Sequence, residues 1–300
     1  MATDLWLDRI VVGMDGSEPA KQAALWAARE AMARGRGLTL VHSVLPPSAG
    51  SAFGPTFPIG LDVMDDVQAA VREELDDYAK TLPTTDVLTQ VEIGSPSGVL
   101  LAASETAELI VLGSRGHGGF RGLLLGSVSV QVAAHADCPV VIIRELPPVD
   151  ARRIVVGVDG SPASEAAIGF AFDMASRHGW TVTAVHAWDV PAYDLLVIPD
   201  GPIPVPLADV VDDEVRLAAE VLAGFQADYP DVVVEERLVR QNPTDALLEA
   251  ATGAAMIAVG TRGHGQVVGA LLGSVSHGVL HKALTPVVVV PFVPGEDDAA

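Results

Sequence analysis

The chain has 300 residues, 49% of them hydrophobic, and its 39 acidic side chains outnumber its 18 Lys and Arg residues, which gives a net charge of −21. This hydrophobic content excludes intrinsic disorder, and the length accommodates two domains of ordinary size. A surface this acidic repels the phosphates of nucleic acids and anionic membranes, so we expect neither as a partner.

Cysteine usage and the pattern of apolar residues indicate the compartment. Cys138 is the single cysteine, so no internal disulfide forms, which suits a reducing cytosol. The first residues include Asp4, Asp8 and Arg9 and form no apolar run, so we expect no secretory signal. No apolar run approaches the ~20 residues of a membrane helix. We therefore expect a cytoplasmic protein.

Strands and helices alternate along the first half of the chain. Runs rich in β-branched residues predict strands, and amphipathic stretches opened by Ser or Pro predict helices. The expected strands are Ile10–Met14, Leu38–Val44, Val87–Ile93, Leu109–Leu112 and Val140–Ile143. The expected helices are 17–34, 65–80, 95–106 and 126–136. This α/β order is typical of a doubly wound parallel sheet with helices on both faces.

The second half of the chain repeats the first. The segment RIVVGMDGS at 9–17 returns as RIVVGVDGS at 153–161, an offset of 144 residues. Later segments return at an offset of 147, among them GSRGH at Gly113 and GTRGH at Gly260. Whole-domain copies in the same order indicate duplication, since a solenoid needs more repeats and a shorter period.

The two copies predict two tandem domains. Their division falls at 145–152, which contains Pro147 and Pro148. The expected domains are therefore 1–146 and 152–294, each a complete α/β fold.

The carboxyl ends of the first and fourth strands predict the place of a ligand site. Asp15 closes the first expected strand, and Gly113 follows the fourth. In doubly wound sheets, ligands bind outside the carboxyl ends of the strands where the strand order reverses. We therefore expect the site between these two strand ends.

A glycine pattern follows the fourth strand of each copy. Gly113, Gly116 and the pair Gly126-Ser127 correspond in the second copy to Gly260, Gly263 and Gly273-Ser274. The last pair opens a helix, whose unpaired N–H groups and dipole favour an anion. The pattern contains neither a Walker A loop nor the dinucleotide fingerprint after the first strand. Glycines that only serve turns are the structural alternative.

This pattern, G-x2-G-x9-G-[ST], resembles that of the universal stress protein family, as do the Asp closing the first strand and the run LIVLG at 109–113. The resemblance covers both halves nearly end to end and is of the tandem-domain type. It implies a five-stranded parallel sheet in the order 3-2-1-4-5 in each domain. It also implies one ATP per domain, with Mg²⁺ bound through the ATP phosphates.

The resemblance implies a set of binding residues in each copy. For the first ATP these are Gly13, Asp15, Ser43, Leu112, Gly113, Gly116, Arg121, Gly126, Ser127 and Val128. For the second they are Gly157, Asp159, Ala187, Val259, Gly260, Gly263, Gly273, Ser274 and Val275. Both aspartates have an alternative reading as helix-capping or turn residues.

Other polar residues near these motifs have either a structural or a ligand-binding interpretation. Arg115, Arg262, His117 and His264 are either solvated loop residues or cations beside phosphate, and Arg121 has Val268 as its counterpart. We interpret His42 and His186 as strand-end histidines without catalytic roles, and Cys138 as a packing residue. The long connections 45–62 and 189–207 leave the second strand of each copy, so they could cover the adenine or contact a partner.

The sequence therefore favours a regulatory ATP-binding stress-response protein that signals to partner proteins. A slow ATPase or phosphotransferase is the alternative, although the glycine loops contain no lysine and no general base is evident. An interaction scaffold without nucleotide is a third reading. The final strands, Val140–Ile143 and Val287–Val290, would be edge strands, so we also expect a homodimer formed through them.

Overall fold

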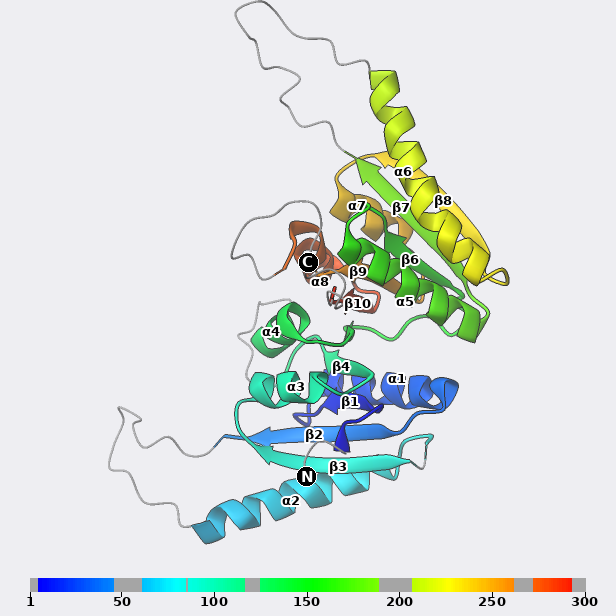
Figure 1. Cartoon of the computed structure of the whole chain (residues 1–300). Coiled ribbons are helices and arrows are strands. Elements are labelled where there is room, and N and C mark those ends of the chain that lie inside the picture. Colours follow the sequence, from blue (N-terminus) through cyan, green and yellow to red (C-terminus); the bar gives the residue numbers. More distant parts are fainter. Residues whose placement is uncertain are drawn as a thin grey trace, which may run out of the picture. The chain divides into compact units, whose positions relative to one another are not determined.

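The computed structural model describes residues 5–45, 61–84, 86–116, 125–188, 207–261 and 272–292. The chain forms two compact units, residues 1–146 and 147–300, here called domain 1 and domain 2. Figure 1 shows the α/β alternation of both domains, each with a central sheet and surrounding helices.

The described residues of domain 1 form five parallel strands. They are β1 (Ile10–Gly13), β2 (Leu38–Val44), β3 (Val87–Ile93), β4 (Leu109–Gly113) and β5 (Val140–Ile143). The helices between them are α1 (Glu18–Arg34), α2 (Leu61–Ala79), α3 (Pro96–Ser104) and α4 (Ser127–His135). The strand order is β3-β2-β1-β4-β5, which confirms the order implied by the family resemblance.

Domain 2 repeats this arrangement. Its strands are β6 (Arg153–Gly157), β7 (Thr181–Trp188), β8 (Val234–Arg240), β9 (Met256–Gly260) and β10 (Val287–Val290). Its helices are α5 (Pro162–His178), α6 (Leu207–Asp228), α7 (Pro243–Ala250) and α8 (Ser274–Lys282). The strand order β10-β9-β6-β7-β8 is that of domain 1, listed from the other edge.

The strand order fixes which helices share a face of the sheet. The chain moves from β1 outward to β3, then returns to β4 and continues to β5. Right-handed crossovers therefore place α1 and α2 on one face and α3 and α4 on the other. In agreement, α3 packs against α4, while α1 lies over β1 and β4. The order reverses between β1 and β4, so a crevice opens at their carboxyl ends.

The helix beginnings follow from local sequence. The side chain of Ser17 accepts a hydrogen bond from the Ala20 N–H at the start of α1, and Ser161 does the same for α5. Proline occupies the first turn of both helices, where it costs no hydrogen bond. The expected helix from Asp65 is wrong at its start, because α2 already begins at Leu61. The helix continues back to that residue because no glycine or proline stands between Gly60 and Asp65.

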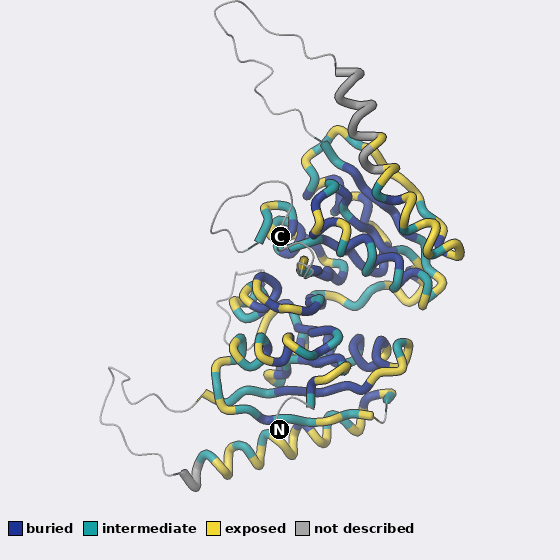
Figure 2. The backbone as a smooth tube through the Cα atoms, in the orientation of Figure 1, coloured by how far each residue is buried: buried dark blue, intermediate teal, exposed yellow. Residues whose placement is uncertain are grey.

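The central strands are buried on both faces. Figure 2 shows this buried layer inside each domain, with exposed residues mainly on the outer helices and loops. The first three residues of β1 and the first four residues of β4 are buried. The outer strand β8 differs, since five of its seven residues are exposed. The continuous apolar runs of the central strands are thus explained by helices on both sides.

An ion cluster fastens the carboxyl end of α1 to the start of β4. The Arg34 guanidinium contacts Glu30 at 2.5 Å and Glu108 at 2.9 Å, and Arg36 also pairs with Glu108. Burial by itself lowers the pKa of Arg34, but the negative charges of Glu30 and Glu108 and their hydrogen bonds to the guanidinium outweigh it, so the pKa is raised. The cluster lies at the opposite end of α1 from the predicted site.

At its other end, α1 meets β4 backbone to backbone. A Cβ added to Gly113 would lie 2.6 Å from the carbonyl carbon of Pro19 and 2.8 Å from the Ala20 nitrogen. In domain 2, a Cβ on Gly260 would lie 2.6 Å from the carbonyl carbon of Ala163. Neither strand end has room for a side chain. Glycine at these positions sets how closely the helix approaches the sheet.

We expect Gly113→Ala to destabilise domain 1 by roughly 1–3 kcal/mol, because the new methyl group overlaps backbone that cannot move aside. Gly260→Ala should act in the same way on domain 2. The matched control is Gly126→Ser, since a Cβ at Gly126 has no neighbour closer than 3.6 Å and serine suits the position before a helix. Urea-induced unfolding measures all three variants. Equal stability of Gly113→Ala and the wild type would contradict this packing argument.

Candidate functional site

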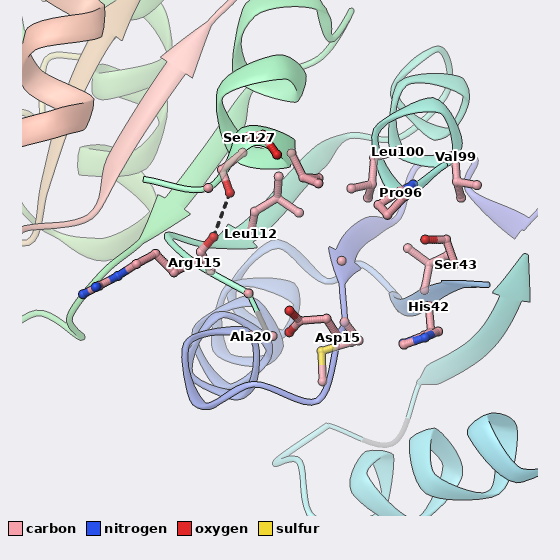
Figure 3. A pocket seen from close by; sticks show the side chains of 18 of the residues that line it. Asp15, Ala20, His42, Ser43, Pro96, Val99, Leu100, Leu112, Arg115 and Ser127 are labelled. Carbon is pink, nitrogen blue, oxygen red and sulfur yellow. Dashed lines mark hydrogen bonds between the residues drawn. The ribbon is translucent and has the colours of Figure 1, made fainter. Parts of the chain in front are cut away.

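A pocket of about 710 Å³ opens at the carboxyl ends of β1, β2 and β4 in domain 1. It lies at the point where the strand order reverses, between the start of α1, the start of α3 and the start of α4 (Figure 3). Because α1 and α3 leave the sheet on opposite faces, their beginnings form opposing walls of the crevice.

The side of the pocket along β2 and α3 is mainly apolar. Val41, Val99, Leu100 and Leu112 line it, together with the half-buried His42. Figure 3 shows Val99 and Leu100 of α3 facing the pocket opposite His42 and Ser43 of β2. Apolar walls with a few polar groups at the edge are typical of a small-molecule pocket.

The opposite side of the pocket is the beginning of α4. Gly126 precedes the helix with φ −78° and ψ 149°, and it provides no side-chain cap. The N–H of Gly126 donates to the Ser114 carbonyl at 2.8 Å, and the Ser129 hydroxyl donates to the Gly113 carbonyl at 2.9 Å. These bonds hold the helix start against the end of β4. The N–H groups of the first helical turn then point along the helix axis toward the pocket, where they attract an anion.

Asp15 lies at the floor of the pocket, where Figure 3 shows its carboxylate beside Ala20. Its Oδ1 accepts the Ser17 N–H at 3.0 Å, which is the turn-forming role considered as the structural alternative. A Cβ on Gly116 would overlap Asp15 Oδ2. The aspartate therefore combines a turn role with a place on the pocket wall, and Gly116 leaves room for its carboxylate.

Domain 2 has the same framework in its described residues. The Gly273 N–H donates to the Thr261 carbonyl at 2.8 Å, and the Ser276 hydroxyl donates to the Gly260 carbonyl at 2.5 Å. Asp159 Oδ1 accepts both the N–H and the hydroxyl of Ser161, at 2.9 and 2.6 Å. The bonds of Gly273, Ser276 and the Ser161 N–H repeat those of Gly126, Ser129 and the Ser17 N–H in domain 1, so the two sites share one backbone design.

The sequence-predicted residues of the first site come together in the structure. The pocket is lined by Gly13, Asp15, Ser43, Leu112, Gly113, Gly116, Gly126, Ser127 and Val128. Arg121 and His117 lie outside the described residues. In domain 2, Gly157, Val259 and Gly260 end β6 and β9, Ala187 lies near the end of β7, and Ser274 and Val275 begin α8. Gly263, Arg262, His264 and Val268 lie outside the described residues, as do 46–60 and 189–206 of the long connections.

Sequence reasoning missed the wall that α3 contributes. Pro96, Val99 and Leu100 line the pocket, as do Met14 and Ser129. The sequence did contain a signal for this wall: the apolar pair Val99-Leu100 lies about one helical turn after Ser95-Pro96, where a helix is expected to begin. Which face of that helix borders a ligand depended on the strand order.

The two strand-end histidines have different surroundings. His186 is buried, and its Nδ1 lies 2.7 Å from the Val158 carbonyl oxygen. His42 is half-buried and lines the pocket. The interpretation as a strand-end histidine with a packing role therefore fits His186. His42 instead lies where it can contact a ligand.

Two arginines, Arg115 and Arg144, follow the carboxyl ends of the neighbouring strands β4 and β5. Arg115 is one of the lining residues of the pocket, and Figure 3 shows its side chain extending away from Asp15 and His42. Arg144 follows β5, and burial together with the positive charge of Arg115 lowers its pKa. Both positive charges thus lie at the carboxyl ends of two neighbouring strands of domain 1.

The remaining chemistry of the described residues is limited. The buried Cys138 thiol has its pKa raised to about 12 by burial, which fits a packing role. Within the described part of the chain, no three or more His, Cys, Asp or Glu side chains group as metal ligands. None of the described helices is both long and apolar enough to span a membrane.

With the fold and the pocket in place, the class of protein is defined. The chain matches the Universal stress protein family over residues 7–144 and again over 151–291. It therefore belongs to this family and contains two of its domains in tandem.

Relatives of the same length support this assignment. A universal stress protein of Mycolicibacterium smegmatis is 37% identical over 293 residues, covering 94% of this chain and 96% of the relative. One from Mycobacterium tuberculosis is 39% identical over 293 residues, covering 93% and 95%. The crystal structure of a universal stress protein from Archaeoglobus fulgidus superimposes with a TM-score of 0.68, at 22% identity, over 97% of this chain and 98% of that one. That structure has the same fold.

Proposed function

We propose that this universal stress protein binds one ATP in each domain and acts as a regulatory protein whose nucleotide state is recognised by partner proteins. The observation that supports this best is the form of the domain 1 pocket. Its apolar side lies along β2 and α3, and its opposite side is the start of α4, a helix preceded by glycine.

The two sides of the pocket match the two ends of a nucleotide. The volume of about 710 Å³ falls within the ~300–1,000 Å³ of typical ligand pockets. An adenine ring would lie between Val99 and Val41, near the backbone of Ser43, where apolar surface is buried. The phosphates would then reach the first turn of α4, whose N–H groups and dipole stabilise negative charge.

Asp15 and the glycines would define the middle of the site. The Asp15 carboxylate is an acceptor that can bind a ribose hydroxyl. Gly113 lets Pro19 pack closely, and Gly116 leaves room for the Asp15 carboxylate. Both glycines therefore shape this part of the pocket by having no side chain. Mg²⁺ bound to the phosphates would offset part of the triphosphate charge.

The second site is proposed from the repeated framework. Gly273, Ser274 and Val275 begin α8 as Gly126, Ser127 and Val128 begin α4. Asp159 keeps its position at the end of β6, and Gly260 keeps the close packing of β9 on α5. Domain 2 therefore offers the same glycine-preceded helix start to a phosphate.

A regulatory role is favoured over catalysis by what lines the described pocket. Among those lining residues, Asp15 is the only carboxylate, and its Oδ1 already accepts a backbone N–H. The lining also lacks a lysine such as phosphotransferases place on the transferred phosphoryl group. The slow ATPase remains the alternative function.

We expect two ATP molecules per chain, and Gly126→Asp should remove one of them. The new carboxylate caps the first turn of α4, which preserves the helix but places a negative charge where the phosphates bind. Loss of one charge-assisted contact corresponds to roughly ten- to hundredfold weaker binding at that site. Gly273→Asp should do the same in domain 2. Calorimetric titration of nucleotide-stripped protein with Mg-ATP counts the sites.

The matched control is Gly224→Ala, since Gly224 lies in α6 and a Cβ there has no neighbour within 4 Å. This variant should keep both sites. A wild-type stoichiometry of one per chain would remove the proposed second site. Full binding by a folded Gly126→Asp/Gly273→Asp double variant would show that the helix starts do not hold the phosphates.

Hydrolysis should be slow, because the described lining of the pocket contains no lysine for phosphoryl transfer and its one carboxylate, Asp15, already accepts the Ser17 N–H. We expect turnover below the ~1 s⁻¹ at the low end of dedicated phosphotransferases. Release of phosphate from Mg-ATP by the purified chain, measured under saturating nucleotide, tests this. Faster turnover that disappears in the Gly126→Asp/Gly273→Asp double variant would favour the ATPase alternative.

We also propose self-association in which the final strands β5 and β10 take part. Each is the last strand in the order of its own domain, and apolar strand edges pair readily. Sedimentation should then give about twice the chain mass of 31.1 kDa. A single species at the chain mass across the micromolar range would exclude a stable homodimer.

A further inference from the structure

Helix α8 carries two histidines one turn apart. The ring centroids of His277 and His281 lie 4.3 Å apart, with an angle of 42° between the ring planes. His277 is exposed and His281 is half-buried, so the pair lies at the surface of domain 2. Neither residue belongs to the nucleotide pocket proposed above, whose helix contribution is the first residues of α8.

The spacing of the pair suits chelation of a metal ion. Residues at i and i+4 lie on the same face of a helix, one above the other. Neutral imidazole nitrogens are common ligands of Zn²⁺, with Zn–N distances of about 2.0–2.1 Å, so two ligands of one ion must lie within about 4.2 Å of each other. Rings with centroids 4.3 Å apart can bring their edge nitrogens within this span by rotating about the side-chain bonds.

The charges around the pair also permit a cation. Lys282 follows His281 directly, and its ammonium group is 3.1 Å from Asp245 Oδ1 on α7. This ion pair partly offsets the positive charge next to the histidines. The net charge of −21 adds a general attraction for cations.

The pair is a feature of domain 2 alone. At the offset of 147 residues, Val130 and Ala134 occupy the corresponding positions of α4. The histidine of α4 is His135, whose Nδ1 lies 2.8 Å from the Gln131 carbonyl oxygen of its own helix. The shared fold of the two domains therefore does not require the histidines.

We propose that His277 and His281 form a surface site for a divalent transition-metal ion, held by two imidazole nitrogens with water in the other coordination positions. Imidazole favours Cu²⁺, Ni²⁺ and Zn²⁺, and the general affinity order places Cu²⁺ first. The oxygen-preferring ions Mg²⁺ and Ca²⁺ do not bind here. The site is thus chemically distinct from any Mg²⁺ that accompanies ATP.

The test is calorimetric titration of the full, tag-free, nucleotide-stripped chain with the chlorides of Cu²⁺, Ni²⁺, Zn²⁺ and Mg²⁺ in a buffer that does not chelate. We expect one transition-metal ion per chain at this site. His277→Ala and His281→Ala should each weaken it roughly a hundredfold or more, because a chelate loses its intramolecular second ligand. His135→Ala is the matched control and should leave binding unchanged.

His277 is exposed, so its replacement leaves the core intact, and the circular dichroism of both variants checks folding. His281→Gln provides a second variant at the half-buried position that keeps a polar side chain. Transition-metal binding unaffected by both histidine variants, or lost equally in His135→Ala, would overturn the proposal. So would a site that binds Mg²⁺ as well as Zn²⁺. Since ATP is absent from the titration, the result is independent of the proposed nucleotide function.

Discussion

The close approach of α1 to the end of β4 is the constraint on which the rest of the site depends. Gly113 allows Pro19 to pack directly on the strand backbone, and Gly260 and Ala163 repeat this contact in domain 2. From this point Ser114 donates its N–H to Ile143 and accepts the N–H of Gly126. The position of the α4 start is therefore set by the same strand end that receives α1.

An acidic protein can still offer an anion site, because the relevant charges act over short distances. Surface charges farther apart than about 8 Å are largely screened at physiological salt. The helix dipole of α4 acts within its first turn, and Arg115 and Arg144 lie near the same strand ends. The net charge of −21 thus describes the whole surface and not this pocket. It favours solubility and disfavours large polyanionic partners.

The two domains share a backbone design but differ in their side chains. Ser43, Met14 and Val99 of the first site correspond to Ala187, Val158 and Ala246, as counted by the repeat offsets. His42 lines the pocket, whereas His186 is buried and held by a backbone carbonyl. The common contacts are made largely by glycine and backbone atoms. Side chains in each copy could therefore change without altering the framework.

The sequence by itself determined the duplication, the alternation of strands and helices, and most element boundaries, because these depend on local periodicity and on capping residues such as Ser17. The residues that the family resemblance implied for the first site line one pocket, Arg121 aside, which lies outside the described residues. The strand order came from the family resemblance, since local patterns carry no information about which strands are neighbours.

Only the tertiary structure decided what each site residue touches. It showed that Pro19 leaves no room for a side chain at Gly113 and that Asp15 leaves none at Gly116. It also showed that α3 provides an apolar wall of the pocket through Val99 and Leu100. It also separated His42 from His186, which look equivalent in the sequence. These facts depend on contacts between segments far apart in the chain. Such contacts arise when the crossovers bring the helices onto the two faces of the sheet, and a local sequence pattern does not record them.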